Sequence, residues 1–528
     1  MLCKVFCACC SGINAVLVTV EVDVSPGISF YLVGLPDNAI KESQQRIGTA
    51  LNHFGYRIPG RRIVINMAPA DMKKEGSAFD ITIAIGILCA SGQISQEEIP
   101  QQRLEKFIIM GELALDGTLR KFPGALPIAA QAAGLGFEAC IFPPESAAEC
   151  AEIDDITIFK ANDIKEAIDI LRSPEQAHRQ VINLKKTDGH PSSAEIGNEK
   201  VFEYDFAGVK GQAIAKSGME IAAAGNHNII LIGSPGCGKT LMAKSLPSIL
   251  PPLSRKEALE TSMIYSVAGL LDNQHGFMKS RPFRAPHHTA TISSLIGGGS
   301  SCMPGEISLA HNGVLYMDEF SEFPRTAIEV LRQPMEDGTV QISRVRSKCQ
   351  YPADFMLVAS MNPCPCGFYG SHSNQCRCSS NAIMRYLSHL SGPILDRIDL
   401  QIFLRPVSPH ELTGSAGPNH EQAKESSSSM SKRVLAARKI QLERFKDENF
   451  CTNSRIPASR LEYYCRIGNK ERAFIEQVMR KFALSARSYG RILKISRTIA
   501  DLDGDDFISL AHISKALQFR NLDKLLNK

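Results

Sequence analysis

A segment of eight residues in the middle of the chain constrains the fold more than any other feature. It reads Gly233-Ser-Pro-Gly-Cys-Gly-Lys-Thr240 and matches the pattern G-x-x-x-x-G-K-[ST] at every fixed position. The apolar run 228–232 before it predicts a buried strand, and residues 241–246 after it predict a helix. A glycine-rich turn in this context directs backbone N–H groups and the positive end of a helix towards phosphate. The segment therefore predicts a nucleotide-binding α/β domain.

We expect every residue of this loop to contact the nucleotide: Gly233, Ser234, Pro235, Gly236, Cys237, Gly238, Lys239 and Thr240. Lys239 would reach the outer phosphates, and Thr240 would hold Mg²⁺. A second apolar strand, 313–317, ends in Asp318 and Glu319 about 80 residues after the loop. Asp318 would hold the metal through a water molecule, and Glu319 would polarise the attacking water. The combination predicts an ATPase that uses ATP and Mg²⁺.

Two further side chains are candidates for the same reaction. The apolar strand 355–361 leads to Asn362, which could orient the attacking water or simply cap the strand. Arg397 lies in the apolar stretch 395–399 and could stabilise developing phosphoryl charge. The alternative for Arg397 is an ion pair with a neighbouring aspartate.

The size and composition of the chain place limits on its class. At 528 residues it exceeds a single core, and a net charge of only +4 means that any nucleic-acid surface must be local. Its 16 unevenly spaced cysteines favour a reduced, cytoplasmic setting, and no apolar run is long enough for a membrane span. We do not expect the first ten residues to be a signal peptide, because they lack a cleavage site. The expected divisions are an N-terminal α/β domain 1–172, a linker 173–200, the ATPase core 201–407, a flexible insertion 408–432 and a helical domain 433–528.

A basic segment inside the core is a candidate for binding DNA. Arg344, Arg346 and Lys348 recur at a period of two and would share one face of a strand. A hairpin that presents these three charges could follow a phosphate backbone, or the segment could be a solvated edge strand whose charges deter aggregation. The compact segment 281–288 and the glycine-rich segment 293–301 read together as a mobile insertion that contacts DNA or a neighbouring subunit.

Four cysteines gather shortly after Asn362. Cys364, Cys366, Cys376 and Cys378 could form a closed tetrahedral zinc site, with His372 as a spare ligand. The C-x-C spacing is tighter than the usual C-x₂₋₄-C, so a reduced, metal-free loop is the alternative.

The chain resembles the magnesium-chelatase-like group of AAA+ ATPases and, within it, the ComM/YifB family. The resemblance rests on residues 66–71, 281–288, 313–320, 362–367 and 391–399. It implies a phosphate-loop AAA+ core with a helical C-terminal lid that closes over the nucleotide. It further implies Asn362 as sensor 1, Arg397 as a finger that reaches a neighbouring subunit, and Arg487 as sensor 2, with Arg491 as the alternative. A ring, usually a hexamer, follows from such a finger.

Residues 111–120 resemble the proteolytic domain of the Lon family, an α+β fold of the ribosomal S5 domain 2 type. Ser77 lies near the expected position of the nucleophile, but 124–127, which should supply the lysine, contains none. We therefore expect this domain to serve packing or assembly.

The function that the resemblance implies is DNA translocation or branch migration, driven by ATP hydrolysis, during recombination of incoming DNA. The partners would be branched or single-stranded DNA and further copies of the chain. The alternatives are a chelatase motor subunit that inserts magnesium into a porphyrin, and a Lon-like protease or protein remodeller.

Overall fold

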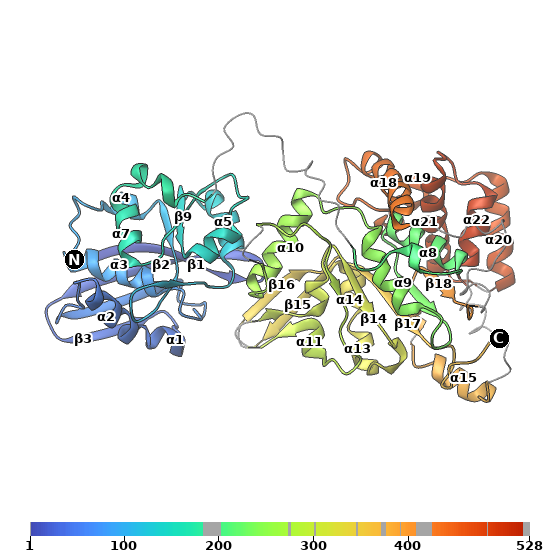
Figure 1. Cartoon of the computed structure of the whole chain (residues 1–528), viewed down its shortest axis with the longest axis horizontal. Coiled ribbons are helices and arrows are strands. Elements are labelled where there is room, and N and C mark those ends of the chain that lie inside the picture. The colour runs from blue at the N-terminus through green and yellow to red at the C-terminus, as the bar shows by residue number, and fades with distance from the viewer. Residues whose placement is uncertain are drawn as a thin grey trace.

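The computed structural model describes residues 2–182, 202–272, 276–299, 302–344, 347–370, 376–390, 392–407, 425–482 and 484–520. Three parts follow one another along the long axis of the molecule: an N-terminal sheet domain, a central α/β domain and a C-terminal helical region (Figure 1). The predicted multidomain α/β architecture is confirmed. In the part of the chain described here, no helix combines the length and apolarity that crossing a membrane requires.

The N-terminal domain is built on a mixed sheet in the order β3-β4-β2-β1-β5-β8-β9. Its strands are β1 (Leu2–Ser11), β2 (Asn14–Ser25), β3 (Ser29–Val33), β4 (Arg62–Ala68), β5 (Phe107–Ile109), β8 (Ala139–Phe142) and β9 (Thr157–Lys160), and β6 (Glu112–Leu113) and β7 (Leu119–Arg120) form a separate hairpin. Its α-helices are α1 (Asn38–Lys41), α2 (Ser43–His53), α3 (Asp80–Ala90), α4 (Gln101–Leu104), α5 (Ala125–Ala132), α6 (Pro144–Glu149) and α7 (Ile164–Arg172). Every residue of α3 is buried, which explains why this helix is apolar all round.

Residues 2–11, to which the sequence analysis assigned no structure, form a central strand. β1 pairs with β2 along its whole length, from Leu2 opposite Asp23 to Ser11 opposite Asn14. Cys3, Val5 and Cys7 are buried, as the period of two in a strand requires. The N-terminal cysteines therefore take part in packing.

The central domain contains a five-stranded sheet in the order β11-β14-β17-β10-β18, and all its pairs are parallel. The strands are β10 (Ile229–Ile232), β11 (Phe283–Arg284), β14 (Val314–Met317), β17 (Met356–Met361) and β18 (Leu400–Phe403). The predicted strands at 228–232, 313–317 and 355–361 are confirmed. Because the strands are parallel, their carboxyl ends meet at one edge of the sheet, where ligands bind in folds of this kind.

Helices and short hairpins surround this sheet. The helices are α8 (Ala213–Gly225), α9 (Lys239–Ser245), α10 (Arg255–Val267), α11 (Ile292–Ile296), α12 (Glu306–Leu309), α13 (Arg325–Glu329), α14 (Arg332–Asp337), α15 (Ser380–Leu387) and α16 (Gly392–Leu395). The hairpins are β12 (Gly297–Gly298) with β13 (Met303–Pro304), and β15 (Thr339–Arg344) with β16 (Ser347–Pro352).

The C-terminal region is helical, as predicted. It comprises α18 (Ser427–Arg444), α19 (Leu461–Tyr464), α20 (Asn469–Phe482), α21 (Ala486–Asp503) and α22 (Leu510–Gln518). α18 and α21 pack on α8 of the central domain. The expected insertion 408–432 is too long, because Ser426 caps α18 and residues 427–432 are helical. Residues 408–424 lie outside the described part of the chain, as does most of the predicted linker.

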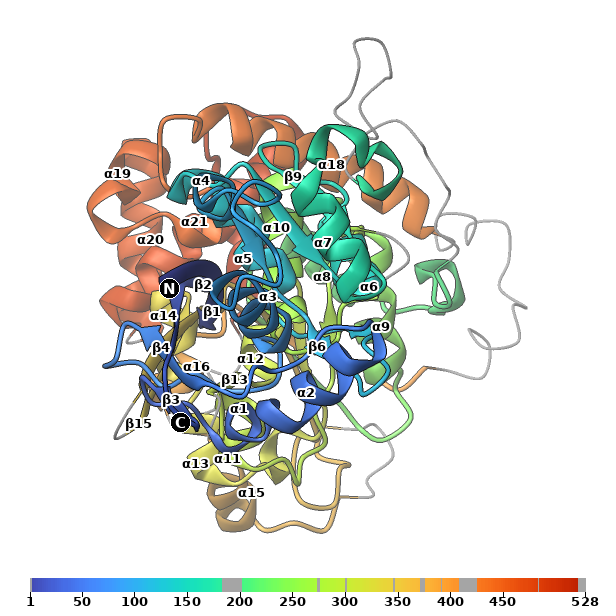
Figure 2. The ribbon, with the colours of Figure 1, turned by 90° about the vertical axis from the view of Figure 1, so that its left-hand side faces the viewer.

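The N-terminal and central domains share one hydrophobic core. α10 of the central domain packs against α5, and its Ile264 is buried among side chains of the N-terminal domain. The Ser266 hydroxyl donates a hydrogen bond of 2.6 Å to Glu149, whose fully buried carboxylate also pairs with Lys121 at 3.0 Å. Figure 2, seen from the N-terminal side, shows α5 directly in front of α10. The N-terminal domain is therefore firmly attached to the central domain.

Candidate functional site

The phosphate loop joins β10 to α9 at the carboxyl edge of the parallel sheet. Gly236 and Gly238 have φ angles of 77° and 91°, in the left-handed region that glycine adopts without strain. A Cβ atom at Gly233 would lie 2.6 Å from the sulfur of the buried Cys237. The backbone of this loop therefore requires glycine at these three positions.

The Lys239 amine lies between the phosphate loop and the end of β17. It donates to the carbonyl oxygens of Gly233 at 2.6 Å and Ser234 at 3.1 Å, and to the Asn362 side-chain oxygen at 3.1 Å. Burial lowers the pKa of Lys239, an effect that Cys237 and the carboxylates beyond it oppose. The structure thus brings together two side chains that lie 123 residues apart in the chain.

A cluster of oxygen atoms next to the loop fits a magnesium ion. The Thr240 hydroxyl donates to the Asp318 carboxylate at 3.1 Å. Ligand oxygens of octahedral Mg²⁺ lie at about 2.1 Å from the ion and therefore about 3 Å from each other. Thr240 and Asp318 have the spacing and the chemistry of two neighbouring ligands, so the residues fit this metal.

Two residues that the sequence analysis missed hold Asp318 in place. The Ser360 hydroxyl donates to the Asp318 carboxylate, and the Tyr316 hydroxyl lies 3.3 Å from Ser360 and 3.4 Å from Thr240. Burial raises the pKa of Asp318, but the hydrogen bonds from Ser360, Tyr316 and Thr240 outweigh it and lower the pKa below its ordinary value. Asp318 is therefore kept ionised. The sequence feature that could have indicated the role of Ser360 is its position as a serine within the otherwise apolar strand β17.

Glu319 follows directly, in a conformation that is rare for residues other than glycine. Its φ angle is 52°, and its side chain is 56% exposed at the carboxyl edge of the sheet. The Nδ1 atom of His288 lies 3.3 Å from the Glu319 carboxylate. His288 is thus a third residue of the site, after Ser360 and Tyr316, whose role the sequence did not indicate.

The segment 281–288 that contains His288 is an integral part of the core, and the prediction of a mobile insertion is wrong for it. Arg281 pairs with Glu257 at 3.0 Å, and Arg284 pairs with Glu306 at 2.7 Å. The segment also contributes β11 to the sheet. These two arginines are paired within the chain.

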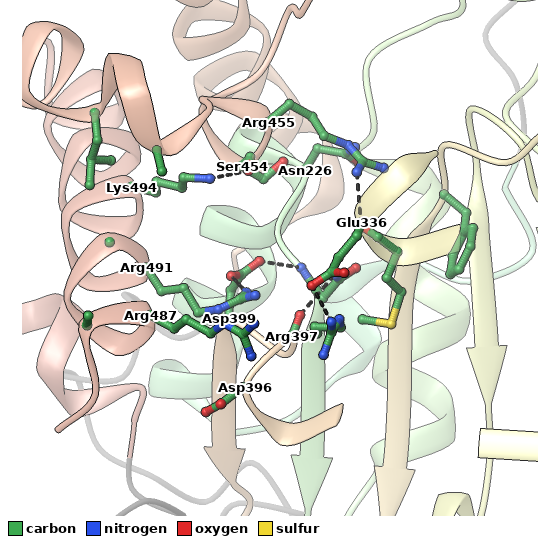
Figure 3. A pocket seen from close by; sticks show the side chains of 17 residues that line it. Asn226, Glu336, Asp396, Arg397, Asp399, Ser454, Arg455, Arg487, Arg491 and Lys494 are labelled. Carbon is green, nitrogen blue, oxygen red and sulfur yellow. Dashed lines mark hydrogen bonds and ion pairs between the residues drawn. The ribbon is translucent and has the colours of Figure 1, made fainter. Parts of the chain in front are cut away.

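Arg397 and Arg487 lie together at the opposite edge of the sheet. They line a pocket of about 420 Å³ that also includes Asn228 and Glu336 (Figure 3). Asn228 lies just before β10, at the amino edge of the sheet, whereas the phosphate loop follows β10 at the carboxyl edge. The helical region therefore does not carry Arg487 to the phosphate loop of its own chain in this structure, contrary to the expectation of a lid that closes over that site.

Arg397 is buried, with 6% of the residue exposed. Its guanidinium donates to the Pro393 carbonyl at 2.6 Å and pairs with the Glu336 carboxylate. The partner is a glutamate from a distant segment, not the neighbouring aspartate that the sequence alternative named.

Asp399 connects the same pocket to the helical region. Its carboxylate pairs with Arg491 of α21 and lies 3.5 Å from the Nδ1 atom of His227. Burial alone would raise the pKa of Asp399, but Arg491 and His227 hold it well below its usual range. Arg491 therefore joins two domains, and Arg487 of the same helix also lines the pocket.

The basic segment forms a hairpin, as expected, but the prediction that its charges share one face of a single strand is wrong. β15 ends at Arg344, β16 begins at Ser347, and Ser343 pairs with Lys348. Arg344 and Lys348 therefore lie on different strands. Arg346 is outside the described residues, as is the side chain of Arg344. β16 packs against β1 of the N-terminal domain.

The four cysteines converge on one point. The sulfurs of Cys364, Cys366, Cys376 and Cys378 all lie within 4.8 Å of one another. The loop follows β17, so the cluster is close to Asn362. His372 lies outside the described residues.

Within the described residues, the hydrogen bond that the Ser77 hydroxyl donates goes to a carboxylate and not to the lysine that proteolysis requires. The acceptor is the Glu112 carboxylate. A carboxylate at this position would hold the hydroxyl, but the expected activating group is a lysine amine.

Comparisons with known proteins agree along almost the whole chain. Residues 205–412 match the family described as magnesium chelatase, subunit ChlI, residues 20–146 match the subunit ChlI of Mg-chelatase, and residues 424–520 match the C-terminal part of this subunit. The competence protein ComM of Haemophilus influenzae is 41% identical over 529 residues, which cover 98% of this chain and 97% of that protein.

Two further relatives mark the breadth of the family. The uncharacterized protein YifB of Salmonella typhimurium is 39% identical to this chain, and the match covers 98% of this chain and 96% of YifB. The magnesium-chelatase 67 kDa subunit of Heliobacterium mobile is 25% identical over 41% of this chain and 35% of that protein. With the phosphate loop and the parallel sheet described above, these matches show that the chain belongs to the ComM/YifB family of magnesium-chelatase-like AAA+ proteins.

Proposed function

We propose that this protein is a ring-forming ATPase, a hexamer, that hydrolyses ATP between adjacent subunits and uses the energy to move DNA. The observation that carries the proposal is the division of the catalytic groups between two edges of one sheet. Lys239, Thr240, Asp318 and Asn362 gather at the carboxyl edge, and the arginines occupy the pocket at the amino edge.

The groups at the carboxyl edge can bind and hydrolyse ATP. Lys239 would exchange its carbonyl partners for the outer phosphate oxygens, and Thr240 and Asp318 would hold Mg²⁺, which neutralises phosphate charge when bound. Glu319 is exposed and would accept the proton of the attacking water. Asn362, fixed by Lys239, would orient that water.

The arginine pocket supports a site shared between subunits. An extended strand rises about 3.3 Å per residue, so the five steps from Asn228 to Gly233 separate the two edges by roughly 16 Å. An arginine side chain does not span this distance. Arg397 and Arg487 are therefore suited to the nucleotide of a neighbour, as finger and sensor 2, in a head-to-tail ring.

DNA is the substrate that we propose, and membership of the ComM/YifB family supports this choice. The match to a protein named competence protein ComM extends over 98% of this chain, and we assign branch migration during recombination of incoming DNA, in the cytoplasm, on this basis. The β15–β16 hairpin belongs to the segment whose sequence carries Arg344, Arg346 and Lys348, and this positive charge could follow a phosphate backbone.

The chelatase alternative has weaker support, because the chelatase subunit from Heliobacterium aligns with only 41% of this chain. Proteolysis is disfavoured by the Glu112 partner of Ser77. We assign the N-terminal domain a role in assembly, in agreement with its shared core with α10.

The proposal is tested by measuring ATP turnover with no DNA, single-stranded DNA, forked DNA and a four-way junction. We expect branched DNA to increase turnover and Lys239→Ala to abolish it. An equal rate in all four conditions, or stimulation by a porphyrin acceptor and Mg²⁺ instead of DNA, would refute the DNA assignment.

A further inference from the structure

We propose that Cys364, Cys366, Cys376 and Cys378 bind one structural Zn²⁺ ion, and that this ion braces the ATP site. The distances between sulfurs are 3.3 Å for Cys364 and Cys366, 3.6 Å for Cys366 and Cys376, and 3.8 Å for Cys364 and Cys376. Thiolates bound to zinc at about 2.3 Å in a tetrahedron lie about 3.8 Å apart. A disulfide would require about 2.05 Å, and all four residues are free cysteines.

The backbone resolves the difficulty that the short C-x-C spacing raised. Gly367 has a φ angle of 83°, and its N–H donates to the Cys364 carbonyl at 2.9 Å, which turns the chain sharply. The Tyr369 N–H donates to the Cys364 sulfur at 3.3 Å. Hydrogen bonds of this kind orient metal ligands from outside the coordination sphere. Both sulfurs of the pair can therefore face one ion.

The first cysteine pair lies against the phosphate loop. A Cβ atom at Gly367 would be 2.8 Å from Pro235 and 3.9 Å from the side chain of Asn362. Cys364 is fully buried, and Asn362, two residues earlier, contacts Lys239. A displacement of this cysteine turn would therefore move groups on both sides of the triphosphate position.

The second cysteine pair, Cys376 and Cys378, is connected through α15 to the Glu319 side of the same site. Ser379, directly after Cys378, caps α15. Tyr386 of that helix hydrogen-bonds to the Ser321 hydroxyl at 2.6 Å, two residues beyond Glu319. An ion shared by the two pairs would cross-link the Asn362 segment to the Glu319 segment. The coupling to nucleotide rests on the proposed ATPase function, whereas zinc binding itself does not.

The test uses the full-length protein purified without chelator. We expect elemental analysis to find one zinc ion per chain, and Co²⁺ exchange to give the thiolate charge-transfer absorption of a four-sulfur site. Cys376→Ser with Cys378→Ser should lose the metal and weaken binding of a fluorescent ADP analogue about tenfold. Cys451→Ser, at an exposed cysteine outside the cluster, is the matched control and should change neither.

Two further samples keep the outcomes separable. Lys239→Ala should lose nucleotide but retain zinc, so failure of the ATPase proposal would leave the zinc result intact. If the double variant does not fold, zinc is removed from the unaltered protein with a chelator and then restored, and nucleotide affinity should fall and recover. Protein that contains no metal and does not take up Zn²⁺ would overturn the site. Full nucleotide affinity without zinc would overturn the proposal that the ion stabilises the ATP site.

Discussion

The Arg397 guanidinium is buried against the Glu336 carboxylate, which joins the turn before β18 to α14. Only 8% of the Arg397 side chain is exposed, compared with 53% of the Glu336 side chain. The glutamate thus fixes the buried arginine in the wall of the pocket that a neighbouring subunit would face in the proposed ring. A finger that is held in place in advance loses little conformational freedom when it meets phosphate.

Mixing two inactive variants tests whether the site is shared. We expect Arg397→Ala to reduce turnover by about a thousandfold while nucleotide binding persists. Lys239→Ala should also be inactive. In rings mixed at equal ratio, roughly a quarter of the contacts join an intact phosphate loop to an intact finger, so activity should partly return. Absence of any recovery in rings shown to be mixed would place Arg397 in its own subunit's chemistry.

His288 is expected to position Glu319. The two side chains are 3.3 Å apart, and the backbone of Glu319 has an unfavourable φ angle of 52°. His288→Ala should lower kcat by about tenfold to a hundredfold with little change in KM, because misplacement of a catalytic group mainly affects the transition state.

The matched control is His287→Ala, since His287 hydrogen-bonds to Thr289 rather than to the glutamate. Steady-state kinetics of both variants distinguish the two roles. A rise in KM with unchanged kcat for His288→Ala would show that the residue serves nucleotide binding instead.

Asp399 should make stability depend on pH. Burial opposes its ionisation, but Arg491 and His227 lower its pKa in the folded state, so the charged form stabilises the fold. This contribution is complete well above the unfolded pKa of about 3.9 and declines as the pH falls below about 4 towards the folded pKa. Asp399→Asn should cost about 3–5 kcal/mol at neutral pH.

Urea unfolding followed by circular dichroism measures this effect, since the chain contains no tryptophan. The difference between Asp399→Asn and the unaltered protein should shrink in acid. Asp396→Asn, in the same pocket, is the control. A difference that stays constant from pH 7 to pH 3 would show that Asp399 acts by packing alone.

The β15–β16 hairpin should contribute to DNA affinity through charge. Replacing Arg344, Arg346 and Lys348 by alanine should weaken binding to all DNA sequences alike and reduce the slope of log K against log salt by about two to three. Fluorescence anisotropy at several salt concentrations measures the slope. Lys446→Ala, an exposed charge in the helical region, is the control. An unchanged slope would exclude the hairpin as a phosphate contact.

Most local features could be predicted from the sequence. The phosphate loop, the strands that end in Asp318 and Asn362, and the C-terminal helices each depend on neighbouring residues and their period. The position of the turn in the β15–β16 hairpin could not be predicted in this way, because a period of two is the same whether a strand continues past Arg344 or reverses. β1 was missed for a related reason. Its apolar residues suit either a strand or a leader, and only the pairing of β1 with β2 distinguishes the two.

The amino-acid sequence by itself determined which chemical groups are present and where each strand and helix delivers them. Only the tertiary structure decided their partners: His288 for Glu319, Glu336 for Arg397, and the second cysteine pair for the first. The physical reason is that local structure follows from the conformational preferences of adjacent residues. Contacts between distant segments depend instead on the path of the whole chain and on the burial that this path achieves.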